Sequence, residues 1–174
     1  KSFGSFVKII VNQQLSAAAA STIMNRVDKL FETKGLTPEE VFQLNDSYLR
    51  EAGVSRAKIK YIKGISKIFV DNPDYIKKLN NLPDQEMLDE LSAIKGFGPW
   101  SCSIYALFYE GRQNIFVYGD ASIYKAIKTI FEVDEAKLDL FLDTKLPSWE
   151  PFKSLACLLF WHYIDSQKSV PSAL

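Results

Sequence analysis

Apolar residues recur along this chain every three or four positions, which is the spacing of an α-helix that buries one face. Two such stripes are Ala20, Ile23, Val27, Leu30 and Phe31, and Ile123, Ile127, Ile130 and Phe131. No sustained alternation of apolar and polar residues, the pattern of a half-buried strand, accompanies them. The only extended-looking piece is residues 113–118. The pattern therefore predicts an all-α protein.

Helix-starting and helix-ending residues stand where this periodicity predicts them. Residues 37–40 (TPEE) have the layout of a capping box with proline in the first turn. Ser16 and Ser55 are each placed to cap a following helix. Gly53 is expected to end a short helix, and the helix that Ser55 begins is expected to run to about Asn72.

A helix, a hairpin and a second helix are predicted around residues 88–104. Leu88, Leu91 and Ile94 have helical spacing and lead into two glycines, Gly96 and Gly98, which allow positive backbone torsions and a close approach by another backbone. Pro99 suits the first position of a new helix because its missing amide hydrogen would have no intrahelical partner there.

Such a hairpin can surround a phosphate with backbone N–H groups, because its glycines carry no side chains and the new helix begins with free amides. A site of this kind binds DNA without reading its sequence. The four residues Gly-Phe-Gly-Pro by themselves also fit an ordinary turn between two helices. The surrounding residues separate the two interpretations.

Four separated segments resemble the helix-hairpin-helix DNA glycosylase superfamily, and specifically its 3-methyladenine DNA glycosylase II branch. They are residues 94–101 (IKGFGPWS), residues 11–16 (VNQQLS), Gly119 with Asp120, and residues 149–156 (WEPFKSLA) with Trp161. They occur in the order expected for the family. The resemblance implies an all-α, two-lobed helix-hairpin-helix glycosylase fold with a cleft between the lobes. The lobes would be residues 1–111, with the hairpin, and 112–174.

Length and composition fit one compact unit. The chain has 174 residues, of which 47% are hydrophobic, enough for one substantial core and too few for two ordinary independent domains. No apolar run approaches the roughly 20 residues that span a bilayer, and the N-terminus lacks a signal-peptide layout. A soluble, intracellular protein of the bacterial cytoplasm or the nucleus is expected.

The two cysteines, Cys102 and Cys157, lie in apolar helical patterns and are interpreted as reduced core residues. Two cysteines cannot hold a four-cysteine iron–sulfur cluster, which separates this chain from the endonuclease III branch of the superfamily. No metal and no cofactor are expected.

The charge balance does not favour nucleic acid, because 21 basic residues are matched by 21 acidic ones. Hairpin amides and local cations such as Lys95 and Arg112 can still position a duplex. The lysine-rich segment 58–67 fits either a solvated helix face, with Ile59, Ile62 and Phe69 on its buried side, or a weak basic patch.

Asp120 is the candidate catalytic residue. It precedes a predicted helix, so an N-cap role explains it by itself, and that position also favours the ionised carboxylate. The resemblance places it where the superfamily has its catalytic aspartate. The two roles are compatible.

The resemblance implies hydrolysis of the N-glycosidic bond of alkylated purines, of the 3-methyladenine and 7-methylguanine type, as the start of base excision repair. The implied partner is double-stranded DNA containing alkylated bases, bound by a monomer. Alkylation leaves the base cationic and a better leaving group, so a lone carboxylate such as Asp120 can support the oxocarbenium-like transition state. The base must first be flipped out of the stack into an aromatic pocket.

Pocket residues are assigned by resemblance to Trp100, Ile104 and Phe152, with core packing as the alternative for each. Three further aromatic residues are assigned to the core: Tyr105, Phe108 and Trp161. In the resembled family the loop at residues 12–16 inserts a side chain into the duplex. Gln14 is the first choice for this wedge and Leu15 the second, while a plain capping loop is the alternative.

The expected DNA-binding residues of the hairpin are Lys95, Gly96, Phe97, Gly98 and Ser101. Bifunctional relatives carry a Schiff-base lysine near the end of the hairpin, and Trp100 occupies that position here, so no lyase activity is expected. Asn114, residues 117–118 and Lys153 depart from the family pattern.

Two alternatives belong to other classes. One is a catalytically silent helix-hairpin-helix module that binds DNA or senses lesions, and the other is a helical protein-interaction domain. The first would keep the hairpin but would not need Asp120 beside an aromatic pocket. The second would explain the neutral charge but not the four ordered segments, and it would show no salt-dependent affinity for DNA.

Overall fold

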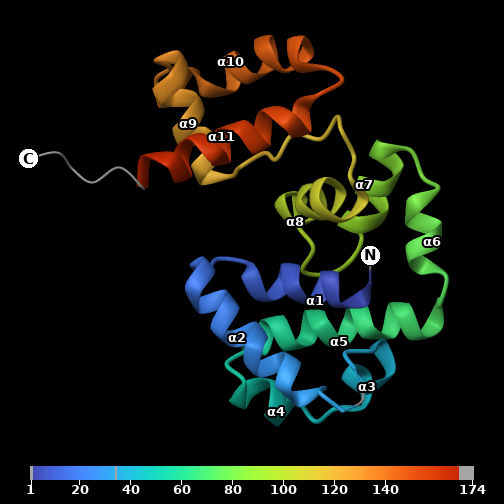
Figure 1. Cartoon of the computed structure of the whole chain (residues 1–174). Coiled ribbons are helices and arrows are strands. Elements are labelled where there is room, and N and C mark those ends of the chain that lie inside the picture. Colours follow the sequence, from blue (N-terminus) through green and yellow to red (C-terminus); the bar gives the residue numbers. More distant parts are fainter. Residues whose placement is uncertain (1, 34, 169–174) are drawn as a thin grey trace, which may run out of the picture. The chain divides into compact units, whose positions relative to one another are not determined.

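The computed structural model describes residues 2–33 and 35–168, and within these ranges it contains helices and connecting segments but no strand (Figure 1). The predicted all-α class is confirmed. The chain divides into two compact units, Lys1–Tyr105 and Ala106–Leu174. The division falls a few residues before the predicted boundary after Gly111.

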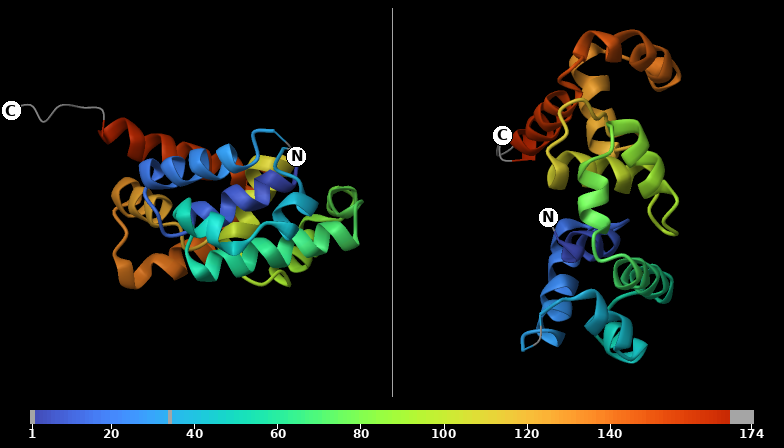
Figure 2. Two further views of the ribbon diagram at one scale, coloured as in Figure 1. Left: turned by 90° about the horizontal axis from the view of Figure 1, so that it is seen from below. Right: turned by 90° about the vertical axis from the view of Figure 1, so that its right-hand side faces the viewer.

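Unit 1 contains eight α-helices among its described residues. They are α1 (Phe3–Asn12), α2 (Ala17–Leu30), α3 (Pro38–Gln43), α4 (Asp46–Glu51), α5 (Arg56–Asp71), α6 (Tyr75–Asn80), α7 (Asp84–Ser92) and α8 (Pro99–Ile104). Helices α1 and α5 lie side by side, as Figures 1 and 2 show. An aromatic cluster centred on Phe6 fills the core, with Phe69, Phe97 and Tyr105 around it at centroid distances of 5.1, 5.4 and 4.5 Å. This cluster joins α1 and α5 to the hairpin and to α8.

The predicted helix starts of unit 1 are confirmed by their capping hydrogen bonds. The hydroxyl oxygens of Ser16, Thr37 and Ser55 each accept a bond from a backbone N–H in the first turn, at 3.3 Å. Pro38 stands in the first turn of α3, and Gly53, at φ +101°, follows the end of α4. Helix α5 ends at Asp71, immediately before Asn72, as predicted.

The π-helical turn η1 (Tyr105–Glu110) follows α8 in the sequence, and all of its residues except Tyr105 belong to unit 2. The other elements of unit 2 are α9 (Ala121–Phe131), η2 (Glu135–Lys137), α10 (Leu138–Lys145), η3 (Leu146–Trp149) and α11 (Lys153–Lys168). Helices α9 and α11 pack against each other (Figure 1). Ile123 and Ile127 are fully buried, in agreement with the predicted stripe.

Three residues of the predicted stripes are wrong as core assignments, whereas Phe31, the last residue of the first stripe, is buried. Ile130 and Phe131 are 44% and 41% exposed, and Leu30 is 36% exposed. The Phe131 ring still contacts Phe141 and Trp149, at centroid distances of 5.0 and 6.3 Å. Periodicity predicts which residues share a helix face, but not how completely other elements cover each of them.

Within residues 2–33 and 35–168, no helix is both long and apolar enough to cross a membrane. Nor do three or more His, Cys, Asp or Glu side chains gather as metal ligands in that described part of the chain.

Candidate active site

The extended segment at residues 113–118 is held in unit 2 by hydrogen bonds to α11. Ser154 is buried, and its hydroxyl donates to the Arg112 carbonyl at 2.6 Å and accepts from the Ile115 N–H at 3.1 Å. The Ser154 N–H donates to the Gln113 carbonyl at 2.9 Å. The extended segment pairs with no strand, so these hydrogen bonds supply the partners that its backbone N–H and carbonyl groups need.

One turn further along α11, the N–H of Val117 donates to the sulfur of Cys157 at 3.4 Å. Cys157 is fully buried, and this burial raises the pKa of its thiol to about 11, with the nearby Asp120 carboxylate adding to the rise. Burial likewise raises the pKa of the Cys102 thiol to about 11. Both cysteines are free and buried, as predicted.

A third residue of the same face, Trp161, reaches Asp120. The indole Nε1 donates to the Asp120 Oδ1 at 3.0 Å. Because Ser154, Cys157 and Trp161 follow one another at intervals of three and four residues, they share one side of α11. That side therefore holds the segment and the aspartate at its end.

Asp120 is the N-cap of α9, as predicted. Gly119, at φ +73°, turns the chain into the helix, and the Asp120 Oδ1 accepts the N–H groups of Ser122 and Ile123, each at 3.0 Å. With the Trp161 indole, three donors converge on one carboxylate oxygen. The half-buried carboxylate is thus fixed in orientation.

The assignment of Phe108 and Trp161 to the core is wrong, whereas Tyr105 is fully buried as predicted. Phe108 is 54% exposed and stacks on Trp161 with ring centroids 5.5 Å apart and planes at 24°. Spacing alone could not separate this pair from the core, because an apolar helix face looks the same whether it packs inward or lines a site. The spacing of Trp161 from Ser154 and Cys157 was the available signal.

Trp100 and Ile104, two of the predicted pocket residues, lie in unit 1. They stand four residues apart on α8, so their side chains share one face of the helix. Both are half-buried. Each keeps apolar surface exposed that a ligand could cover.

Phe152, the third predicted pocket residue, lies just before α11 and is 55% exposed. It lines a hollow of about 370 Å³ with Trp149 and Phe131. Trp161 is nine residues further along, which corresponds to about 13 Å on a helix axis. Phe152 therefore belongs to a different part of unit 2 from Asp120.

The two glycines of the hairpin in unit 1, residues 95–98, differ in backbone conformation and in the space around them. Gly96 has φ +90°, and a Cβ added there would lie 2.2 Å from the Tyr61 ring. Gly98 has φ −76°, and a Cβ there would have no atom within 4 Å. Gly96 is thus required by the fold itself, whereas Gly98 leaves open space on the hairpin.

The other predicted hairpin residues divide into exposed and buried ones. Lys95 is exposed. The side chains of Phe97 and Ser101 are each 2% exposed, because Phe97 packs on Phe6 and the Ser101 hydroxyl accepts a bond from Gln13. The side chains of Phe97 and Ser101 thus belong to the interior of unit 1, which leaves the backbone as the part of these residues that the expected phosphate contact would use.

The loop between α1 and α2, residues 13–16, presents both wedge candidates outward. Gln14 is exposed and has φ +55°, an uncommon backbone conformation for a residue with a side chain. Leu15 is 39% exposed. Ser16 also caps α2. The loop therefore caps a helix and presents two exposed side chains at the same time.

Two lysines of the segment 58–67 belong neither to a solvated helix face nor to a basic patch, because their ammonium groups bind backbone carbonyls. Lys58 Nζ donates to the carbonyls of Val11 and Gln13 at 2.9 and 2.7 Å. Lys63 Nζ donates to the carbonyl of Phe42 at 2.9 Å and also to that of Leu44. The expected buried residues of this segment, Ile59, Ile62 and Phe69, are buried.

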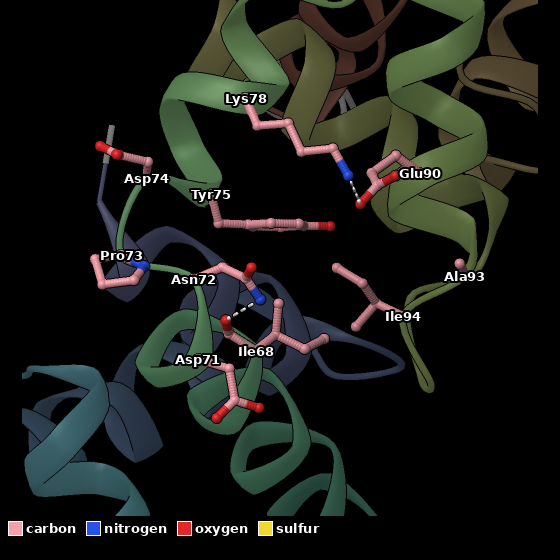
Figure 3. A pocket seen from close by; sticks show the side chains of 10 residues that line it. All are labelled: Ile68, Asp71, Asn72, Pro73, Asp74, Tyr75, Lys78, Glu90, Ala93 and Ile94. Atoms are coloured by element: carbon pink, nitrogen blue, oxygen red, sulfur yellow. Dashed lines mark hydrogen bonds and ion pairs between the residues drawn. The ribbon is translucent and has the colours of Figure 1, made fainter.

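A separate cavity of about 550 Å³ lies in unit 1 between the end of α5, α6 and α7. Figure 3 shows the Tyr75 ring extending into it beside the ion pair of Lys78 and Glu90, whose atoms are 2.7 Å apart. Burial and the neighbouring Glu90 raise the pKa of Tyr75. The residues that line it include none of the predicted site residues.

The chain also matches known proteins in sequence and in fold. The model of the HhH-GPD superfamily of base excision DNA repair proteins matches residues 7–151. The Bacillus subtilis protein YfjP is 27% identical over 169 residues, which cover 94% of this chain and 59% of YfjP. The chain therefore spans less than two thirds of that relative.

Two solved structures have the same fold. The DNA-3-methyladenine glycosidase of Bacillus halodurans has a TM-score of 0.80 at 32% identity, covering 95% of this chain and 76% of that one. The Schizosaccharomyces pombe 3-methyladenine DNA glycosylase Mag1, solved in complex with abasic DNA, has a TM-score of 0.84 at 21% identity, covering 97% and 83%. The predicted resemblance to 3-methyladenine DNA glycosylases is confirmed, and this chain belongs to the HhH-GPD superfamily of base excision DNA repair proteins.

Proposed function

We propose that this chain is a monofunctional DNA glycosylase that flips alkylated purines, of the 3-methyladenine and 7-methylguanine type, out of duplex DNA and hydrolyses their N-glycosidic bond. The observation that carries the proposal is the Asp120 carboxylate, held by three donors at 3.0 Å. One of these donors is Trp161, on which the exposed Phe108 ring stacks. The names of the relatives support the same lesion class.

The chemistry needs little from the protein beyond electrostatics. The bond between C1′ and the ring nitrogen breaks with its electron pair going to the base, so a cationic alkylpurine leaves as a neutral molecule. Water adds to C1′ and releases one proton. Asp120 would stabilise the positive charge that develops on the sugar and orient the water, and its fixed orientation lowers the reorganisation that this requires.

Aromatic surface beside Asp120 would favour a cationic base. A cation over an aromatic face gains about 0.5–2 kcal/mol, the larger value once water is excluded. Trp100 and Ile104 stay the proposed pocket residues of unit 1. In unit 2 we favour Phe108 over Phe152, because Phe108 stacks on the tryptophan that binds Asp120.

DNA binding is proposed for the hairpin and for the loop at residues 13–16. Gly98 leaves room for a phosphate against the hairpin backbone, and Lys95 adds an exposed cation. That Mag1 was solved with abasic DNA supports DNA as the ligand. The absence of lyase activity is proposed because Trp100 occupies the position of the Schiff-base lysine of bifunctional relatives.

The test compares base release from methylated duplex DNA by the wild type and by Asp120→Asn. Asparagine retains an oxygen that can accept the same three hydrogen bonds and is a favoured N-cap, so the fold is kept while the charge is lost. We expect the single-turnover rate to fall about 100-fold or more. DNA affinity is expected to stay within about threefold, a change below 1 kcal/mol.

Asp134→Asn, an exposed substitution before η2 in the same unit, is the matched control and should release base at the wild-type rate. Strand breaks should appear only after alkali. Breaks formed by the wild type before alkali would contradict the monofunctional assignment. Equal behaviour of wild type and Asp120→Asn, with DNA bound and no base released, would instead indicate the catalytically silent binding module.

A further inference from the structure

Two segments of unit 1 that are proposed to contact DNA, the hairpin at residues 95–98 and the loop at residues 13–16, are joined by one side chain. The Gln13 amide Nε2 donates to the Gly96 carbonyl at 2.8 Å and to the Ser101 hydroxyl at 2.9 Å. These acceptors are more than 80 residues away in the sequence. The Gln13 amide is therefore a direct link between the end of α1 and the hairpin.

The backbone of Gln13 is held from the opposite direction by α5. Lys58 Nζ donates to the Gln13 carbonyl at 2.7 Å and to the Val11 carbonyl at 2.9 Å. Both carbonyls lie at the C-terminal end of α1, where the helix leaves its last acceptors without intrahelical donors. The ammonium thus fixes the direction in which the chain leaves α1, one residue before Gln14.

The same helix also supports the hairpin. Tyr61 is one turn after Lys58 on α5, and its ring lies so close to Gly96 that an added Cβ would stand 2.2 Å from it. One face of α5 therefore meets the loop through Lys58 and the hairpin through Tyr61. The Gln13 amide adds the third contact, which joins the loop directly to the hairpin.

We propose that Gln13, held by Lys58, is a positioning residue that locks the loop carrying Gln14 to the hairpin, so that wedge insertion and the phosphate grip occur as one rigid step. The proposal rests on the proposed function of the two segments as DNA contacts. Gln13 itself touches neither base nor phosphate and acts through Gln14. Its loss should therefore affect base unstacking and excision but leave the hairpin's grip on undamaged DNA.

The test uses a duplex in which 2-aminopurine flanks a tetrahydrofuran abasic analogue, because its fluorescence reports unstacking without any base release. Gln13→Met keeps the length of the side chain and removes both donors. We expect the unstacking equilibrium and the single-turnover excision rate on methylated DNA each to fall about tenfold, since two hydrogen bonds of modest strength are lost. Affinity for undamaged duplex, measured by anisotropy, should change by less than about twofold.

A double-mutant cycle separates positioning from an independent role. If Gln13 acts through the wedge, the variant with both Gln13→Met and Gln14→Ala should be no worse than Gln14→Ala alone. Lys58→Met should reproduce Gln13→Met, and Lys58→Arg, which can donate to the same two carbonyls, should restore the signal. Gln85→Met is the control, because Gln85 is exposed and bonds only locally to Asp89 on α7 at 2.8 Å.

Four results would overturn the proposal. In the first two, Gln13→Met unstacks 2-aminopurine as well as the wild type does, or it loses as much affinity for undamaged DNA as it loses in unstacking. In the other two, the effects of Gln13→Met and Gln14→Ala add up in the double variant, or the wild type itself leaves 2-aminopurine stacked. If Gln13→Met does not fold, the same comparisons apply to the Lys58 pair. A Gln13-dependent unstacking signal in a protein that releases no methylated base would support the positioning role while contradicting the proposed enzyme activity.

Discussion

Single residues in this protein serve the fold and the site through the same atoms. The Asp120 Oδ1 caps α9 and also accepts the Trp161 indole. An N-cap preference explains the first bond but not the second, because Trp161 comes 41 residues later. Lys58 is a second example. Its segment is expected to form a solvated helix face or a weak basic patch, but the Lys58 ammonium donates to two backbone carbonyls.

The two hairpin glycines lead to a prediction at this scale. Gly96→Ala should lower the free energy of unfolding by at least about 2 kcal/mol, because it combines a left-handed backbone with a collision against the Tyr61 ring. Gly98→Ala should lower it by about 1 kcal/mol or less, since φ −76° suits alanine and only N-cap preference is lost. Urea denaturation followed by circular dichroism measures both.

The same pair separates folding from DNA binding. Gly98→Ala should weaken duplex binding, because its Cβ would occupy space that is empty in the protein and proposed for phosphate. Anisotropy with labelled duplex checks this. Unchanged affinity in Gly98→Ala would argue against the hairpin as the phosphate site.

Among the elements, α11 determines where the catalytic candidate lies. Ser154, Cys157 and Trp161 hold residues 112–120 along one side of the helix. The segment makes no strand ladder, so these side chains supply the partners that its backbone lacks. The candidate catalytic aspartate is therefore positioned by a helix that follows it in the sequence.

Ser154→Ala should lower the free energy of unfolding by about 1–3 kcal/mol, because the buried Ile115 N–H and the Arg112 carbonyl lose their partner. Ser166→Ala is the matched control. Its hydroxyl is exposed and bonds only to the Tyr163 carbonyl one turn earlier, so its effect should stay within about 0.5 kcal/mol. Equal effects of the two substitutions would show that α11 does not hold the segment through Ser154.

At the scale of the whole molecule, two buried thiols make stability depend on alkaline pH. The folded-state pKa of Cys102 and of Cys157 is about 11, above the ordinary value of 9.0. Between these values the unfolded chain loses thiol protons that the folded chain keeps. The stabilisation is therefore complete below pH 9 and is lost as the pH rises to 11.

Chemical denaturation at pH 8, 9, 10 and 11 tests this expectation. The free energy of unfolding of the wild type should fall above pH 9, and it should fall less steeply in Cys102→Ala and in Cys157→Ala. The comparison is between slopes, because each alanine also removes buried volume at every pH. Parallel curves for wild type and both variants would mean that the thiols do not contribute.

The sequence by itself determined the all-α class, the positions of the helix caps, the glycine hairpin and the candidate aspartate. These features depend on neighbours within about four residues, where backbone torsions and capping hydrogen bonds are decided locally. The family followed from four short segments in order.

Only the tertiary structure decided which apolar and polar side chains have partners that the periodicity of the sequence does not predict. Trp161 and Phe108 form an aromatic stack at Asp120, Ser101 turns inward to Gln13, and Lys58 binds carbonyls at the end of α1. Each depends on a partner tens of residues away, and periodicity contains no information about which distant element covers a given face. For that reason the hydrogen bonds between the hairpin and the loop at residues 13–16 became visible only in the folded chain.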